Sequence, residues 1–201
     1  IDTEESFPED LIDQGFTHVI HSGSALSITE TAPFVERAVG FVQKARDAGV
    51  WQMGICYGHQ LLAHAMGGLV ENFPAGLELG TVHVTLSDEA DKDPLFKGLP
   101  KRIKAHASHT QTVTQLPPDA TLLASGADEP HHAFAMGPHT WGLQFHPEFD
   151  VDIMKTYIHE FAGLMETHGQ DPQKTAEAIV ETPHSRSLLQ RFAKIAMSQE
   201  N

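Results

Sequence analysis

The first half of the chain alternates short apolar runs with longer amphipathic stretches, a pattern typical of an α/β protein. Apolar runs over residues 16–21 and 50–55 predict two strands. Between them, apolar positions at helical spacing predict a helix that Thr31 caps and Gly49 ends. A second helix is predicted over residues 58–66, so the second strand runs almost directly into it.

The middle third of the chain carries shorter runs with strand periodicity, separated by Pro117-Pro118 and Gly137-Pro138. These runs are interpreted as antiparallel β-hairpins added to the α/β core. The predicted strands cover residues 82–86, 103–107, 113–116, 121–124, 132–136 and 141–145.

One continuous helix is predicted after these strands, over residues 151–166. Met154, Ile158, Phe161 and Met165 recur at helical spacing along it. We therefore expect all four side chains on one buried face.

The remaining residues predict a C-terminal helical appendage. Asp171-Pro172 and Thr182-Pro183 are typical of helix starts. We place a domain over residues 1–168 and the extension over 169–201. The second helix of the extension carries an apolar stripe, which packs either on the core or on a second copy in a homo-oligomer. The stripe consists of Leu188, Leu189, Phe192, Ile195 and Ala196.

Composition excludes several classes of protein. The 201 residues carry a formal net charge of −14, which argues against nucleic acid as a partner. A single cysteine cannot form an internal disulfide, and no apolar run is long enough to span a membrane. We therefore expect a cytoplasmic protein. The 14 histidines show no ligand spacing typical of a metal site, so no metal is expected.

The segment from Gly54 to Gln60, Gly-Ile-Cys-Tyr-Gly-His-Gln, carries the first candidate chemistry. A strand runs into Cys56 and then directly into a helix, and the flanking glycines Gly54 and Gly58 allow a sharp turn. The helix N-terminus behind the sulfur favours the thiolate. Cys56 is therefore the candidate nucleophile.

A cysteine nucleophile needs a base and a group that orients the base. His146 follows an apolar strand, and Glu148 lies two residues further on, close enough for its carboxylate to hold the imidazole. Pro147 between them fixes the local backbone. The three side chains Cys56, His146 and Glu148 are predicted to form a catalytic triad.

These two motifs resemble the G-x-C-x-G-x-Q elbow and F-H-P-E strand end of class I, or triad type, glutamine amidotransferases. The likeness is greatest to the amidotransferase domain of GMP synthetase and its stand-alone relatives, and it covers residues 16–165. It implies a flavodoxin-like three-layer α/β sandwich with a mixed central sheet. It also implies hydrolysis of the glutamine side-chain amide through a γ-glutamyl thioester on Cys56, with no cofactor or metal.

The resemblance further implies an oxyanion hole. Residues 21–25, His-Ser-Gly-Ser-Ala, take the position of the family's S-G-G-P loop. Backbone N–H groups of Gly23, Ser24 and Tyr57 would face the oxyanion. Ser24 replaces a glycine of the family pattern, so we expect an unusual φ at Ser24, which glycine tolerates better.

Substrate contacts are implied for Gln60, which matches the family's elbow glutamine, and for residues 108–111. Those residues match the family's S-H-G-D loop, with two departures from it. A weaker match to an E-x-G element falls on residues 78–80, Glu-Leu-Gly. The residues that take the loop positions are Ser108, His109, Thr110 and Gln111.

Three functions are compatible with these motifs. The first is glutamine hydrolysis that supplies ammonia to an acceptor synthetase on a separate chain. The second is hydrolysis of γ-glutamyl peptides or conjugates by the same triad. The third is a non-catalytic regulatory domain, in which the triad would be retained without turnover.

The family pattern begins with a strand and helix before the oxyanion-loop strand. Residues 1–10 do not show the pattern of that strand. We therefore expect that this sequence lacks an N-terminal portion, roughly 40 to 50 residues on the size of one βαβ unit.

Overall fold

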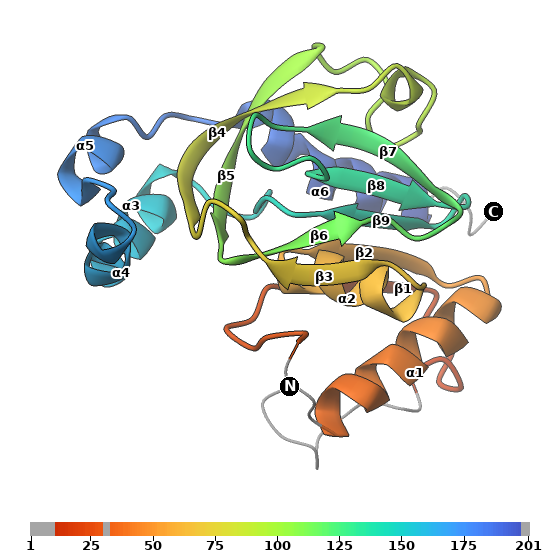
Figure 1. The fold of residues 1–201 in the computed structure, drawn as a ribbon. Coiled ribbons are helices and arrows are strands. Elements are labelled where there is room, and N and C mark those ends of the chain that lie inside the picture. Colours follow the sequence, from red (N-terminus) through yellow and green to blue (C-terminus); the bar gives the residue numbers. More distant parts are fainter. Residues whose placement is uncertain (1–10, 30–32, 198–201) are drawn as a thin grey trace.

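The computed structural model describes residues 11–29 and 33–197. A seven-stranded sheet with the order β1-β2-β9-β8-β7-β4-β5 forms its centre (Figure 1). A second, two-stranded sheet pairs β3 with β6. The strands are β1 (His18–His21), β2 (Trp51–Ile55), β3 (Leu69–Asn72), β4 (Glu78–Leu86), β5 (Arg102–His109), β6 (Gln111–Gln115), β7 (Ala120–Ser125), β8 (Ala133–Met136) and β9 (Thr140–Leu143).

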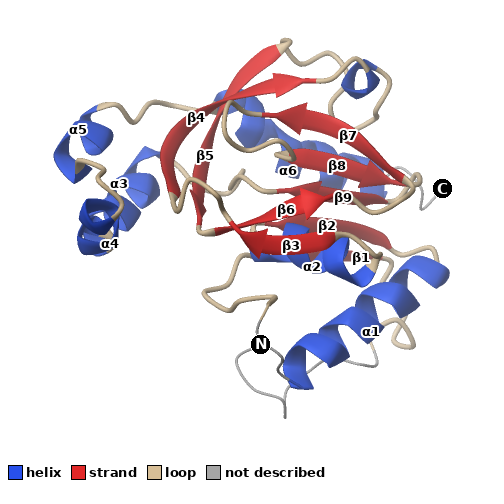
Figure 2. Cartoon of the chain, viewed as in Figure 1, coloured by secondary structure: helices blue, strands red, loops and turns tan. Residues whose placement is uncertain are grey.

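The central sheet is mixed. β1, β2 and β9 are parallel, whereas β8, β7, β4 and β5 continue the sheet by antiparallel pairing. The predicted hairpins are therefore present, and β4–β5 and β7–β8–β9 extend the central sheet itself. Only the β3–β6 pair stands apart from it among the strands described (Figure 2).

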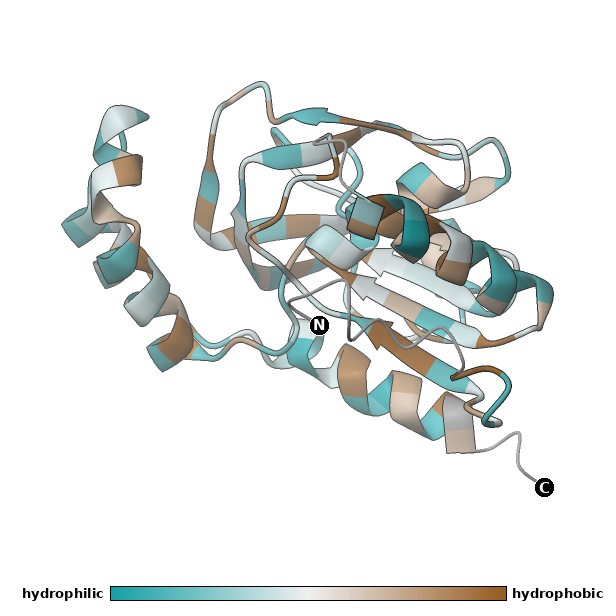
Figure 3. Ribbon diagram, turned by 90° about the horizontal axis from the view of Figure 1, so that it is seen from below, coloured by the Kyte–Doolittle hydropathy of each residue, from teal (hydrophilic) through white to brown (hydrophobic). Residues whose placement is uncertain are grey.

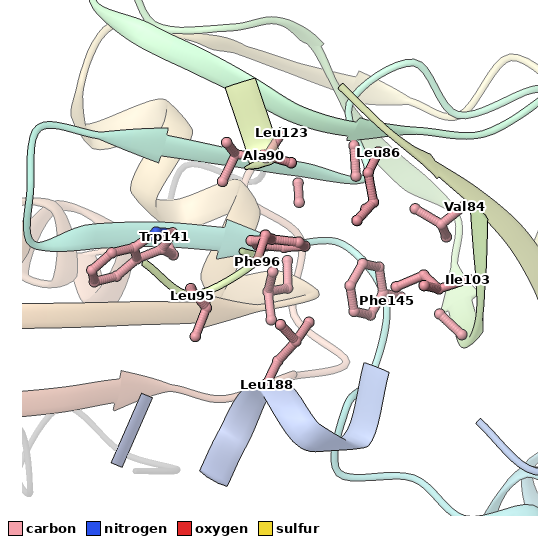
Figure 4. Packing of buried hydrophobic residues seen from close by; sticks show 14 of the residues in the cluster. Val84, Leu86, Ala90, Leu95, Phe96, Ile103, Leu123, Trp141, Phe145 and Leu188 are labelled. Carbon is pink, nitrogen blue, oxygen red and sulfur yellow. The ribbon is translucent and has the colours of Figure 1, made fainter. Parts of the chain in front are cut away.

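Helices cover both faces of the sheet, which gives three layers. The helices are α1 (Pro33–Asp47), α2 (Tyr57–Ala65), α3 (Val151–Glu160), α4 (Ala162–Thr167), α5 (Pro172–Glu177) and α6 (Pro183–Met197), with a 3₁₀ turn at Glu89–Asp91. Val42 of α1 and Leu62 of α2 belong to the buried cluster on one face. Leu188 and Phe192 of α6 belong to the cluster on the other face, where Leu188 points at the sheet (Figure 4).

α1 confirms the first predicted helix. Its buried positions include Ala38, Val42 and Ala45, while charged residues face outward. Figure 3 shows this alternation of hydrophobic and hydrophilic residues along the helices. Gly49 ends the helix with a φ of +71°, a left-handed conformation that suits glycine. The predicted cap Thr31 lies outside the described residues.

The prediction of one helix over residues 151–166 is wrong. The chain forms α3 and α4 instead, with a break at Phe161. This residue is the C-cap of α3 and the N-cap of α4, with φ and ψ of −100° and 15°. Met154, Ile158 and Met165 are buried as expected. Phe161, at the break, is instead 41% exposed.

The C-terminal helices start where the proline patterns predict. Asp171 caps α5 by accepting a hydrogen bond from the N–H of Lys174. α6 packs its stripe on the core, with Leu188 and Phe192 buried. The side chain of Ala196 lies outside what the structure describes. The domain boundary after residue 168 stays a prediction. Among the described residues, no helix is long and apolar enough to cross a membrane.

Candidate active site

Three parallel strands deliver the candidate catalytic segments to one edge of the sheet. His21 at the end of β1 pairs with Gly54 of β2, and Gly54 pairs in turn with Gly142 of β9. The loop after β1, the elbow after β2 and the segment after β9 therefore leave the sheet side by side. Parallel sheets bind ligands at this carboxyl edge.

The elbow at Cys56 has the strained geometry of a nucleophile turn. Cys56 has a φ of +50°, the one positive φ outside glycine among the residues that the structure describes. A side chain at Gly54 would lie 2.3 Å from the carbonyl oxygen of Gly58, and one at Gly58 would lie 2.0 Å from that of His21. Both glycines are thus required by close backbone packing. The predicted sharp turn is present.

His146 and Glu148 form the expected pair. The N–H of His146 donates to the carbonyl of His106 at 2.7 Å, which fixes the backbone beyond β9. The ring Nδ1 donates to Oε1 of Glu148, also at 2.7 Å. Burial lowers the pKa of His146, but the hydrogen bonds and charges of Cys56 and Glu148 outweigh burial and raise this pKa to about 10.

The thiol of Cys56 lies beside this imidazole without a well-formed hydrogen bond to it. Sγ donates instead to the carbonyl of Ser108 at 3.5 Å, and Nε2 of His146 has no hydrogen-bond partner among the described residues. The proximity of Cys56, together with the hydrogen bond and charge of Glu148, therefore raises the pKa of His146. Catalytic hydrogen bonds are often long in the absence of substrate.

The loop after β1 packs directly on the triad. A side chain at Gly23 would lie 3.1 Å from Cε1 of His146 and 3.7 Å from Cβ of Cys56. Glycine at this position lets the backbone approach the reacting atoms. Ser24 does not have a positive φ, so the serine causes no left-handed strain, and its hydroxyl accepts the N–H of Leu26 at 3.1 Å. The expectation of an unusual φ at Ser24 is wrong.

Gln111 is one of the two departures from the family's S-H-G-D loop. Its side chain ties the loop after β1 to the core. Its Oε1 accepts the N–H of Ile28 at 3.2 Å, and its Nε2 donates to the hydroxyl of Thr29 at 2.9 Å. Gln60 in turn holds the backbone of Gln111, because its side-chain amide donates to the carbonyl of Gln111 at 2.8 Å and to Oε1 of Gln144 at 3.1 Å. Both amide hydrogens of Gln60 are thus used within the protein.

His109 is held between two acceptors. Its Nδ1 lies 3.0 Å from the carbonyl of Gln111, and its Nε2 lies 2.9 Å from Oε2 of Glu78. Burial raises the pKa of Glu78, but the hydrogen bond from His109 and the nearby His132 outweigh burial and lower it. These two contacts of His109 fix the backbone that carries Ser108 and Gln111. The exposed Thr110 lines the pocket without a side-chain hydrogen bond of this kind.

One pocket of about 800 Å³ collects these segments. All the predicted site residues line it except Tyr57, whose backbone follows Cys56 at the start of α2. Among the described residues, no group of three or more histidine, cysteine or acidic side chains is placed to hold a metal. The sequence did not indicate the apolar part of the lining, which includes Leu26, Leu77, Phe149, Tyr157, Phe161 and Leu164.

The family model for class I glutamine amidotransferases matches residues 2–162. The chain belongs to this family. Against a GMP synthase of Thermomicrobium roseum, described as glutamine-hydrolysing, the chain is 33% identical over 197 residues, which cover 94% of this chain and 35% of that enzyme. This member of the family thus spans about a third of the length of that relative.

Two further likenesses bear on the site. A γ-glutamyl peptidase of Arabidopsis thaliana is 29% identical over 177 residues, which cover 87% of this chain and 70% of the peptidase. The crystal structure of a glutamine amidotransferase from Thermotoga maritima superposes with a TM-score of 0.73 at 24% identity, over 90% of this chain and 78% of that one. The superposition shows the α/β fold, which confirms the predicted fold class.

Proposed function

We propose that this family member hydrolyses the γ-glutamyl amide bond, with L-glutamine as the smallest substrate, through a thioester on Cys56. One observation carries the proposal: a strained cysteine and a hydrogen-bonded His146–Glu148 pair line the same pocket. The raised pKa of His146 supports it, because the imidazole carries its proton at neutral pH and can donate it to a leaving amine.

The proposed reaction has two steps. The proton that His146 carries is the one that Cys56 has given up, and the resulting thiolate attacks the γ-carbonyl carbon to form a carbon–sulfur bond. The carbon–nitrogen bond then breaks as His146 returns the proton to the leaving nitrogen. In the second step a water molecule gives a proton to His146 and attacks the thioester, which releases glutamate and the thiol. Glu148 holds the ring with Nε2 toward these atoms.

The negative oxygen that forms during each attack needs donors. We assign these donors to the backbone N–H groups of Gly23, Ser24 and Tyr57. The close approach of Gly23 to His146 and Cys56 supports the assignment. So does the tether from Gln111 to Ile28 and Thr29, which would hold the loop in place when the charge develops.

With glutamine, the product would be ammonia, and the acceptor synthetase would be a separate chain. The 33% identity to the GMP synthase of Thermomicrobium roseum, described as glutamine-hydrolysing, supports glutamine as the substrate. The γ-glutamyl peptidase supports hydrolysis of larger γ-glutamyl compounds instead. We propose a cytoplasmic location for either role, where reducing conditions keep the only cysteine free.

The test uses the single cysteine. Wild-type protein is incubated with glutamine and glutamate is measured; an electrophilic glutamine analogue is then followed by intact mass. We expect glutamate release and one covalent adduct in the wild type, and neither in Cys56→Ala. Circular dichroism confirms that the variant is folded. Glutamate release by a folded Cys56→Ala protein, or a folded wild type that neither reacts nor turns over, would contradict the proposal; the second result would favour a regulatory domain.

A further inference from the structure

A row of aromatic rings begins on the catalytic histidine and runs outward along the pocket. Phe149 stacks on His146, with ring centroids 4.1 Å apart and planes 17° from parallel. Tyr157 follows at 4.6 Å from Phe149, and Phe161 at 5.7 Å from Tyr157. All four rings line the same pocket. The proposed mechanism uses only the first of them.

The position of this row relates it to one part of the substrate. His146 gives its proton to the departing nitrogen, so the leaving amine must lie against His146 when the bond breaks. The glutamyl part would lie on the side of residues 108–111, whose backbone is fixed by Gln60 and His109. The aromatic row extends from His146 and is therefore placed to contact whatever is attached to the leaving nitrogen.

Tyr157, Phe161 and Leu164, on α3 and α4 and at the break between them, form an apolar wall of the pocket. Phe161, at the break, and Leu164, in α4, are 41% and 38% exposed and line the pocket. Leu26, 51% exposed, adds an apolar side chain from the loop after β1. A volume of about 800 Å³ falls in the range of pockets that enclose drug-sized ligands.

The charged side chains of the pocket further restrict which leaving amines it can accept. Among the described residues, no lysine or arginine lines it, so neither of these side chains is available to pair with a carboxylate on the leaving amine. Among the described residues of the lining, Glu148 is the one acidic side chain, and it is engaged with His146 and is poorly placed to bind a cation. Both a carboxylate-bearing peptide and a polycationic amine are therefore poor matches for this wall.

We propose that the preferred substrate is a γ-glutamyl amide of a neutral, apolar amine, in particular one that carries an aromatic ring. The inference rests on the proposed γ-glutamyl hydrolysis and specifies its leaving group. The glutamyl carbonyl lies at Cys56, the leaving nitrogen at His146, and the ring against Tyr157, Phe161 and Leu164. Such offset or edge-on aromatic contacts stabilise a bound ring beyond the effect of its burial.

The experiment compares three substrates of the wild-type protein by kcat/KM: γ-glutamyl-benzylamine, γ-glutamyl-glycine and glutamine. We expect γ-glutamyl-benzylamine to be preferred over each of the others by at least about tenfold, on the scale of apolar-pocket discrimination. Equal or faster hydrolysis of glutamine or γ-glutamyl-glycine would overturn the inference while leaving the proposed function intact. Hydrolysis of none of the three would overturn both.

The variant Phe161→Ala tests the wall itself. Because the Phe161 side chain is exposed, we expect the variant to fold. We expect the ratio of kcat/KM for γ-glutamyl-benzylamine to that for glutamine to fall roughly tenfold. Ile153→Ala is the matched control, since Ile153 lies on α3, is 38% exposed and is absent from the pocket lining. Equal losses for both substrates, or no loss for either, would overturn the inference; no loss would favour a protein-docking role for this face.

Discussion

The elbow at β2–α2 and the wall at α3–α4 meet in one pocket but are built in opposite ways. At the elbow, Gly54 and Gly58 have no room for a side chain, and Cys56 is held at a φ of +50°. At the wall, Gly163 has no atom within 4 Å of a built side chain, and Phe161 and Leu164 remain partly exposed.

The difference separates the reaction from the choice of substrate. Dense packing around the elbow over-determines a conformation that is unfavourable for cysteine by itself, and so keeps the sulfur aimed at the pocket. The wall contributes side chains from a short, exposed helix, where substitutions affect folding little. Chemistry would therefore be sensitive to changes at the elbow, whereas the leaving-group preference could change through α3 and α4.

The largest expected effect is that of Gly58→Ala. The added methyl would lie 2.0 Å from the carbonyl oxygen of His21, in a backbone contact that no rotamer can relieve. We expect the free energy of unfolding to drop by about 3 kcal/mol or more, at the upper end of overpacking. Urea unfolding followed by circular dichroism measures it. A loss below about 1 kcal/mol would mean that the elbow is loosely packed.

Glu148→Gln should preserve the fold and impair the reaction. Removing the carboxylate charge lowers the pKa of His146 from about 10, and we expect kcat/KM to fall about 10²-fold or more. Glu160→Gln on the exposed end of α3 is the control. Titration of the His146 ring by NMR checks the cause, since an unchanged pKa would contradict the role given to Glu148.

The raised pKa of His146 also predicts how the free energy of unfolding changes with pH. The folded pKa of His146, about 10, is above the ordinary 6.5, so its stabilisation is complete below about pH 6.5 and is lost as pH rises toward 10. The free energy of unfolding should therefore decline less steeply over this range in Glu148→Gln than in the wild type. Equal slopes would contradict the assigned pKa.

The smallest expected effect is that of Gly163→Ala. Alanine in the open position on α4 restricts the unfolded chain and favours the helix, so we expect a gain of about 0.5–1 kcal/mol in the free energy of unfolding. Thermal unfolding measures it. The same glycine-to-alanine change would then lower the free energy of unfolding at Gly58 and raise it at Gly163. A decrease in the free energy of unfolding for Gly163→Ala would remove this contrast between the two regions.

Local sequence determined most of the elements and singled out the candidate triad. Strand and helix periods are local, and the spacing of Gly54, Cys56 and Gly58 allows few backbone paths other than a sharp turn. His146 and Glu148 are two residues apart, so their contact also follows from short-range geometry.

Only the tertiary structure decided how the rest of the pocket is formed. The apolar spacing of residues 151–166 is the same for one helix as for two, and the break at Phe161 depends on how the chain packs beside β4. Likewise, the use of Gln111 as a tether requires Ile28, 83 positions away in sequence. Local sequence patterns therefore located the candidate catalytic groups, whereas long-range packing set the shape of the pocket around them.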